Sequence, residues 1–363
     1  MKAIASREKE TQAQVQQLCR ALLYEGYSLF PYHRAAVKNQ KPVPFGAIYP
    51  AAYAKAHAAV NSVLQAECLI QAHSTGAAVT AQVRFLHLRS WKELGPGELA
   101  ASPNATVGVP ASEVPILQTA ETYHPSGWLA VEREFRPECP SCSSAGSALK
   151  TSHIEISGLC ETQPLRNPDG EVIGSRLETM RELKGLVTTE VQPMPAKPDC
   201  FKLAIRLTNQ SKLDQPNELS RDEAGAYAFL APHLILSVSG GEFISVLEPD
   251  DAWRPLVAEC RNLGAWPVLV GRDNRTLLVS PIILHDYPEI SPQSTGDLFD
   301  GSEIEEALLL HAAVMSDQEK DAIAASDDKL RAMIERIRQV TPQDLLNLHG
   351  VLHPYNPTGE PKP

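Results

Sequence analysis

An alternating stretch at residues 201–209, FKLAIRLTN, decides the fold. Its apolar positions recur at every second residue: Leu203, Ile205 and Leu207. This period is typical of a strand that buries one face. Residues 150–162 and 171–192 carry similar β-branched and alternating apolar residues. The Asp169-Gly170 pair before the second run supplies the left-handed backbone of a tight turn. Together these stretches predict an antiparallel sheet.

Two other stretches predict β-hairpins. Residues 62–88 contain two extended segments separated by the polar residues 73–76, and the second segment alternates as a strand with one buried face does. Residues 234–247 form two β-prone runs joined by Gly240 and Gly241, which adopt positive φ at little cost. Both patterns favour strands paired through a short turn.

Helical periodicity is found at the two ends of the chain and in one insertion. Residues 8–23 read as an amphipathic helix, and residues 249–262 as a shorter one. In the C-terminal quarter, two capping boxes and a Thr-Pro pair predict three helix starts: Ser302 with Glu305, Ser316 with Glu319, and Thr341 with Pro342.

These patterns predict an α+β fold. We expect a mixed or antiparallel β-rich core with inserted helices, an N-terminal helix and a C-terminal helical segment. A length of 363 residues predicts more than one compact region. The expected regions are an N-terminal α+β region with a helix, an aromatic loop and a hairpin (1–136), a flexible loop or boundary (137–149), a β-rich region (150–300), C-terminal helices (301–353) and a tail (354–363).

Composition restricts the partners. The chain has 33 Lys and Arg against 44 Asp and Glu, a formal charge of −11, which repels a phosphate backbone and argues against nucleic acid. Its apolar runs are far shorter than the roughly 20 residues that cross a bilayer, and residues 1–10 lack the apolar core of a signal peptide. Seven cysteines, an odd number lying mostly in apolar segments, indicate reduced thiols. We therefore expect a cytoplasmic protein without a membrane span.

Catalytic signatures are absent from the sequence. It contains no phosphate-binding loop, dinucleotide fingerprint, nucleophile elbow or HExxH motif. This favours a non-enzymatic protein, although acid–base sites assembled from distant residues leave no local signature. Cys139 and Cys142 have the spacing of a metal knuckle, with His153 and Cys160 as further ligands if the fold brings them close. We predict no cofactor; zinc or iron at the cysteine pair is the alternative, beside a redox dithiol and an ordinary loop.

The stretch from Thr276 to Glu319 contains nine acidic residues and no Lys or Arg. Such a segment carries a concentrated negative field. Three interpretations compete: a cation site using Asp286, Asp297 and Asp300, a solvated helix face, or a docking surface for a basic protein patch. The docking interpretation assigns partner binding to four acidic residues and two aromatic anchors: Asp286, Asp297, Asp300 and Glu303, with Tyr287 and Phe299.

A second polar and aromatic group follows the N-terminal helix. Tyr24, Tyr27 and Tyr32 lie there among charged residues and chain breakers. They are candidates for lining a pocket or binding a partner, and the alternative is that their rings pack at a domain edge.

With these residues in view, the chain resembles an uncharacterised conserved bacterial family encoded with nickel-iron hydrogenase gene clusters. The resemblance covers most of the chain and rests on these blocks: residues 23–27, 31–32, 38–39, 84–88, 240–243, 260–262, 266–271 and 280–306. No catalytic residue carries over from this family.

The resemblance implies a non-catalytic accessory protein for assembly or maturation of a nickel-iron hydrogenase. Its partner would be a hydrogenase subunit or a maturation factor, held at the acidic docking surface. The alternative is a metal-binding or enzymatic protein, with Cys139 and Cys142 as ligands or with a pocket formed by His285, Asp286 and Tyr287.

Overall fold

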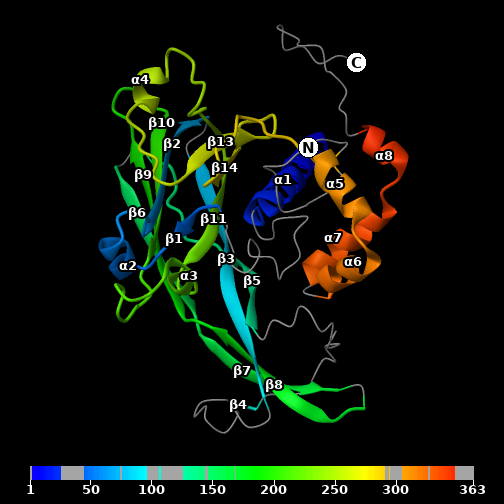
Figure 1. Ribbon diagram of the computed structural model, residues 1–363. Helices are drawn as coiled ribbons and strands as arrows, with labels where there is room; N and C mark the ends of the chain where they lie inside the picture. Colours follow the sequence, from blue (N-terminus) through cyan, green and yellow to red (C-terminus); the bar gives the residue numbers. More distant parts are fainter. Residues whose placement is uncertain are drawn as a thin grey trace.

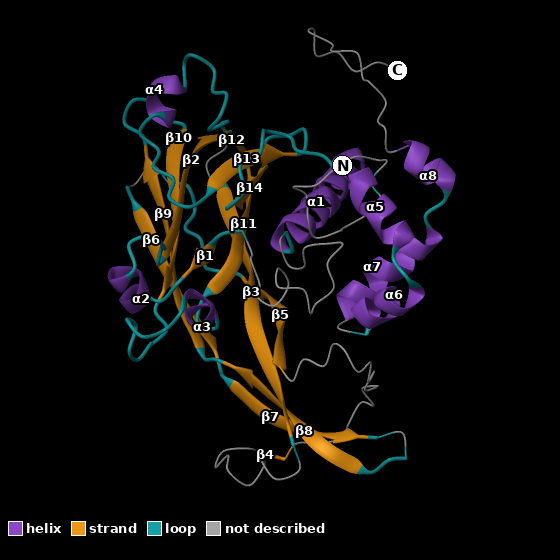
Figure 2. Ribbon diagram, in the orientation of Figure 1, coloured by secondary structure: helices purple, strands orange, loops and turns teal. Residues whose placement is uncertain are grey.

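Two β-sheets packed face to face form the body of the protein in this computed structural model (Figure 1, Figure 2). The structure describes residues 2–25, 45–73, 76–95, 106–107, 126–143, 146–167, 169–290, 294, 305–325 and 328–347. The strand pairs are antiparallel except for one short parallel pair at the end of the larger sheet. With helices at both ends of the chain, this confirms the predicted α+β fold.

Within the described residues, the larger sheet has nine strands and the smaller sheet has five. The larger sheet runs β13 (Trp266–Val270), β14 (Thr276–Ser280), β11 (Phe229–Ser239), β3 (Ala78–Leu94), β8 (Val172–Met180), β7 (Leu159–Arg166) and β4 (Thr106–Val107), with β1 (Ala47–Ile48) on β11 and β5 (Ser126–Phe135) on β3. The smaller sheet runs β12 (Gly241–Phe243), β2 (Val63–Ala72), β10 (Cys200–Asn209), β9 (Leu183–Pro193) and β6 (Ala148–Ile156).

The main core lies between the sheets. Leu203, Ile205 and Leu207 point into it from β10, which confirms the alternation read from the sequence. From the larger sheet, Phe85 meets Phe229 edge to face, with ring centroids 4.7 Å apart. Burying a side chain of this size stabilises the fold by about 1.5–3 kcal/mol.

The two predicted hairpins are wrong, although their strands are real. β2 belongs to the smaller sheet and β3 to the larger, and β11 and β12 are divided in the same way. In each case the chain crosses from one sheet to the other, so the apolar faces of the two strands meet across the core instead of lying side by side. The crossings stack on each other: Ala72 pairs with Gly241, and the His73 N–H donates to the Gly240 carbonyl at 2.8 Å.

Gly240 and Gly241 are needed for this crossing for two different reasons. Gly240 has a φ of 72°, in the left-handed region that glycine adopts without strain. At Gly241, a Cβ atom would lie 2.6 Å from the Gln71 carbonyl oxygen. The glycine pair therefore permits a tight passage between sheets, not the predicted hairpin turn.

A second pair of crossings creates an arm. The predicted strands 150–162 and 171–192 are each divided, into β6 and β7 and into β8 and β9, where the chain leaves the smaller sheet and joins the larger one. The β7–β8 hairpin pairs with the end of β3 and projects beyond the sandwich (Figure 1). We call β7, β8 and residues 89–94 of β3 the arm. Its turn has Gly170 at a φ of 84°, as the sequence predicts.

The segment 137–149 joins the two sheets at an open edge of the sandwich. The Cys142 N–H donates to the Ala77 carbonyl at 2.9 Å beside β3, and the Thr189 hydroxyl of β9 donates to the Glu138 carbonyl at 2.6 Å. Its described part is thus anchored rather than loose. Each sheet contains strands that precede this segment in the sequence and strands that follow it: β2 pairs with β10 in the smaller sheet, and β3 pairs with β11 in the larger sheet.

Helix α1 (Lys2–Leu23) covers the outer face of the larger sheet. Val15, Leu18 and Cys19 are buried there against β11, β13 and β14, as the amphipathic pattern predicts. The helices α2 (Ala51–Ala56), α3 (Arg221–Gly225) and α4 (Arg254–Val257) are short insertions. No helix in the described part of the chain is both long and apolar enough to span a membrane.

The C-terminal helices lie on the same side of the sandwich as α1 (Figure 2). They are α5 (Glu305–Val314), α6 (Asp317–Ala324), α7 (Asp328–Gln339) and α8 (Pro342–Asn347). The capping box of Ser316 and Glu319 is confirmed, and Thr341 caps α8 by exchanging hydrogen bonds with Asp344. Three helices were predicted; the second is divided into α6 and α7. Ser302 lies outside the described residues.

Candidate functional site

The β13–β14 turn and helix α1 form two walls of a hollow on the molecular surface. Gly271 opens this turn with a φ of 79°, and a Cβ atom on it would lie 2.5 Å from the Thr11 side chain of α1. Glycine therefore lets the helix rest directly on the turn. The hollow beside this contact has a volume of about 870 Å³. Its lining residues are Thr11, Gln14, Gly271, Arg272, Asp273, Asn274, Tyr287 and Glu289.

The third wall is the segment after β14, which is fixed to the edge of β13. Asp286 accepts hydrogen bonds from the Leu269 N–H at 2.7 Å and the Ser245 hydroxyl at 2.5 Å. The Tyr287 N–H donates to the Leu269 carbonyl at 2.7 Å. From α1, the Gln14 amide donates to the Pro288 carbonyl at 3.2 Å. The segment therefore covers the strand edge and holds its own side chains in place.

Tyr287 adopts a conformation that a bulky residue rarely takes. Its φ is 57°, yet the residue is 48% exposed where it lines the hollow. The hydroxyl donates to the Asn274 Oδ1 atom at 2.8 Å. Partial burial raises the pKa of Tyr287, and the negative charges of Asp286 and Glu242 raise it further. The ring thus stands in an acidic field and is held by strained but well-bonded backbone.

The residues predicted for the acidic docking surface differ in where the structure places them. Asp286 has both carboxylate oxygens occupied by the protein itself, so its role is to support the β13 edge. Tyr287 is exposed, as a contact residue must be. Asp297, Phe299, Asp300 and Glu303 lie outside the described residues.

Of the three tyrosines predicted as partner contacts after the N-terminal helix, the structure describes Tyr24. Tyr24 is only 2% exposed, and its hydroxyl donates to the Glu132 Oε2 atom at 3.4 Å. Its ring lies 4.1 Å from the Lys329 ammonium of α7. Tyr24 is therefore part of the interior between α1 and the C-terminal helices, which corrects its assignment as a partner contact. Tyr27 and Tyr32 lie outside the described residues.

His285, Asp286 and Tyr287 do not converge on a pocket. Asp286 points to β13, the Tyr287 hydroxyl points to Asn274, and the exposed His285 is not part of the hollow's lining. The hollow instead uses Glu289 together with residues of α1 and the β13–β14 turn. Sequence spacing could not reveal this set, because the α1 residues lie far along the chain from the other two segments.

Cys139 and Cys142 lie in an apolar setting. Burial raises the pKa of each thiol to about 11. His153 lies on β6 of the smaller sheet, and Cys160 on β7 of the larger sheet. In the part of the chain that the structure describes, no group of three or more His, Cys, Asp or Glu residues could hold a metal ion.

A buried polar network that the sequence did not indicate lies beneath α1. The Arg84 guanidinium pairs with Glu132 and donates to the Gln16 Oε1 atom at 2.7 Å. Beside it, His233 is fully buried, with Nδ1 bonded to the Ala231 carbonyl and Nε2 bonded to the Ser280 hydroxyl. Arg84 and His233 are buried beneath α1. We assign them to fixing α1 on the sheet.

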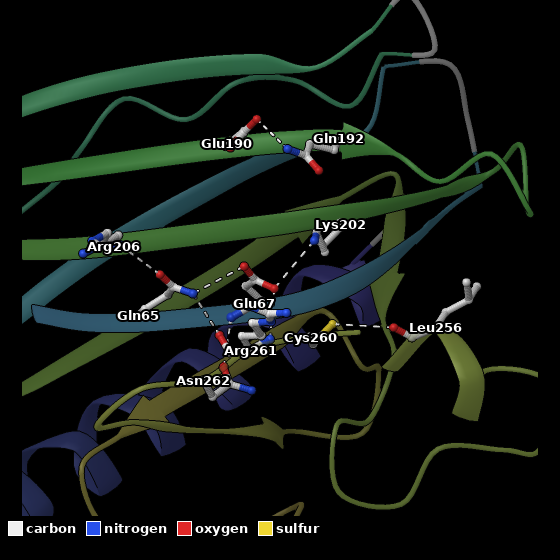
Figure 3. A network of polar contacts seen from close by, with 10 residues as sticks. All are labelled: Gln65, Glu67, Glu190, Gln192, Lys202, Arg206, Leu256, Cys260, Arg261 and Asn262. Carbon is white, nitrogen blue, oxygen red and sulfur yellow. Dashed lines mark hydrogen bonds and ion pairs between the residues drawn. The ribbon is translucent and has the colours of Figure 1, made fainter. Parts of the chain in front are cut away.

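The Cys260-Arg261-Asn262 block has a structural role (Figure 3). The Arg261 N–H donates to the Glu67 carboxylate at 2.9 Å, and the Glu67 N–H donates to the Asn262 Oδ1 atom at 2.9 Å. Lys202 lies 3.6 Å from the same carboxylate. The block therefore fastens the loop after α4 along the edge of β2.

Comparison with known proteins does not identify the chain. No protein-family model matches it, and no curated protein matches it either.

Proposed function

We propose that this is a non-catalytic accessory protein for assembly or maturation of a nickel-iron hydrogenase, acting in the cytoplasm. It would bind a basic surface of a hydrogenase subunit or maturation factor through the hollow beside α1. The observation that carries the docking part of this proposal is Tyr287, which strained backbone holds exposed where it lines the hollow. The hydrogenase part rests on the family resemblance.

The chemistry of the hollow suits a basic partner. Glu289 and Asp273 place carboxylates in its lining, and Asp286 and Glu242 add negative charge near the Tyr287 ring. An aromatic face beside carboxylates attracts a Lys or Arg side chain through both ion pairing and cation–π contact. Arg272 is a basic member of the lining and would meet an acidic residue of the partner. Exposed aromatic anchors of this kind contribute much of the affinity of protein interfaces.

The three segments that line the hollow are held in place by hydrogen bonds and packing. A partner could therefore bind there without a large rearrangement of the backbone.

Co-purification from the native host tests the proposal. In the variant Tyr287→Ala/Glu289→Lys, recovery of hydrogenase polypeptides with the tagged protein should fall by about tenfold or more, as expected when an anchor and a favourable charge are lost. Glu155→Lys is the matched control, because Glu155 is an exposed acid on the outer face of β6. It should co-purify as the parent does.

Two results would contradict the proposal. Hydrogenase polypeptides would be missing from the parent's co-purifying proteins, or they would be recovered equally with the double variant. Thermal unfolding of each variant shows that a loss of recovery is not a loss of folding. The variant Asp297→Lys/Asp300→Lys/Glu303→Lys tests the rest of the predicted acidic surface in the same assay.

A further inference from the structure

The base of the arm carries a row of charged and polar side chains on one face of the larger sheet. β3 pairs with β5 along one edge and with β8 along the other, because residues 89–92 pair with both. Arg133 of β5 is opposite Phe85, and Met180 of β8 is opposite Arg89. Paired residues share a face, so all four point to the same side as His87. His87 lies midway between the two pairs.

Arg133 must therefore cross β3 above His87. Its Nη2 atom lies 3.5 Å from the Met180 sulfur, which belongs to the strand on the far side of β3. The straight path between these two residues passes over position 87. This explains why His87 is fully buried. It also explains how Arg133, together with burial, lowers the pKa of His87 to about 4.

These groups lack the acceptors that their chemistry requires. Three buried atoms have no hydrogen-bond partner among the described residues: both ring nitrogens of His87 and the Nε atom of Arg133. The Arg181 backbone lies close enough to the ring to raise the pKa of His87, yet no contact between them meets hydrogen-bond geometry. A buried donor without an acceptor costs about 1–3 kcal/mol. Two such donors on one face, the single N–H of the neutral His87 ring and the Nε–H of Arg133, thus call for an external acceptor.

The charge on Arg133 is also uncompensated. The other arginines on this face pair with carboxylates, Arg89 with Glu178 and Arg176 with Glu93. Among the described residues, the one hydrogen-bond partner of the Arg133 side chain is the Met180 thioether, which is a weak acceptor. Arg133 as a whole residue is half-buried.

We propose that Arg133 and His87 form a binding site for a small oxyanion, a phosphate or a carboxylate, at the base of the arm. The anion accepts hydrogen bonds from the Arg133 guanidinium and, when Arg133 swings away from Met180 and uncovers the ring, from the N–H of the neutral His87 ring. It supplies both the missing acceptor and the missing negative charge. The site is separate from the docking hollow and does not depend on the proposed function.

Thermal unfolding with inorganic phosphate, or with acetate, tests the site against chloride at the same ionic strength. The melting temperature of the parent should rise and saturate with phosphate or acetate, and the tighter of the two assigns the ligand class. In Arg133→Met the apparent affinity should be about tenfold weaker, as expected for the loss of one charge-assisted hydrogen bond. Arg206→Met is the matched control, since Arg206 is an exposed arginine on the outer face of β10. It should respond as the parent does.

Equal responses of the parent and Arg133→Met, or no anion-specific response of the parent, would overturn the site. NMR of the parent with labelled histidine gives a test that does not depend on the variant's folding. The His87 ring signals should shift with added phosphate or acetate, and the residue should titrate at a higher pH. Unmoved His87 signals would mean that only water satisfies these groups.

Discussion

The buried imidazole of His233 should make the protein sensitive to acid. The Ala231 carbonyl can only accept, so the Nδ1 atom of His233 carries the proton and donates to it at 2.7 Å. The Nε2 atom then accepts from the Ser280 hydroxyl at 3.2 Å. The ring is therefore neutral. Burial lowers its pKa to about 4, and the Arg84 guanidinium contributes to this shift, while the hydrogen bond to Ala231 opposes it.

The size and sign of the effect follow from proton linkage. In the unfolded chain the pKa of His233 returns to its ordinary value of 6.5. Below that pH the unfolded state binds a proton that the folded state does not, so the free energy of unfolding decreases as the pH falls from 6.5 to about 4. At pH 4.5 the loss amounts to about 2.5 kcal/mol, at 1.36 kcal/mol for each pKa unit. Below pH 4 the contribution is constant.

Urea denaturation of the parent and His233→Gln at pH 7.5 and pH 4.5 measures this loss. The glutamine keeps a donor and an acceptor but does not titrate, so its loss between the two pH values should be smaller by about 2.5 kcal/mol. His285→Gln is the control, because His285 is exposed. If the parent and His233→Gln lose equal stability, His233 is not a buried neutral ring and the reasoning fails.

Three other predictions concern the interior. Asn209→Ala should lower the free energy of unfolding by about 3 kcal/mol in urea, because its amide bonds to the Ile48 and Tyr227 carbonyls and to the Ser211 N–H; a loss below about 1 kcal/mol would contradict this role. Gly241→Ala should cost about 1–3 kcal/mol through its clash with the crossing strand, and an unchanged urea midpoint would show that the crossing is looser than described. Iodoacetamide at pH 8 should modify the exposed Cys160 well before Cys142, whose pKa is raised to about 11; mass spectrometry showing the reverse order would refute the burial of Cys142.

The sequence predicted which residues form strands and helices better than it predicted which strands pair. Alternation reports which face of a strand is buried, and Leu203, Ile205 and Leu207 are buried as expected. It does not report whether the next strand lies beside that face or opposite it. Both missed hairpins are of this kind, since the strands around 73–76 and around Gly240 satisfy the same alternation by crossing between sheets.

The candidate site was predictable only in part. Tyr287 was identified from its position in the acidic stretch, and it is exposed. Asp286 belonged to the same pattern, but its hydrogen bonds to Leu269 and Ser245 depend on strands distant in sequence. Thr11 and Gln14 reach the hollow from the opposite end of the chain. Local sequence motifs contain no information about contacts between residues that are distant in the sequence.

The interleaving of the two sheets has a consequence for synthesis on the ribosome. Val63 of β2 finds its partner Thr208 in β10, and Val79 of β3 finds Val238 in β11. These residues of β2 and β3 therefore cannot pair with β10 and β11 until more than a hundred later residues have been translated, and their apolar faces stay uncovered until then. At ordinary elongation rates, such a nascent chain exposes aggregation-prone β-segments for many seconds. We therefore expect chaperones that shield exposed apolar segments to bind it during synthesis.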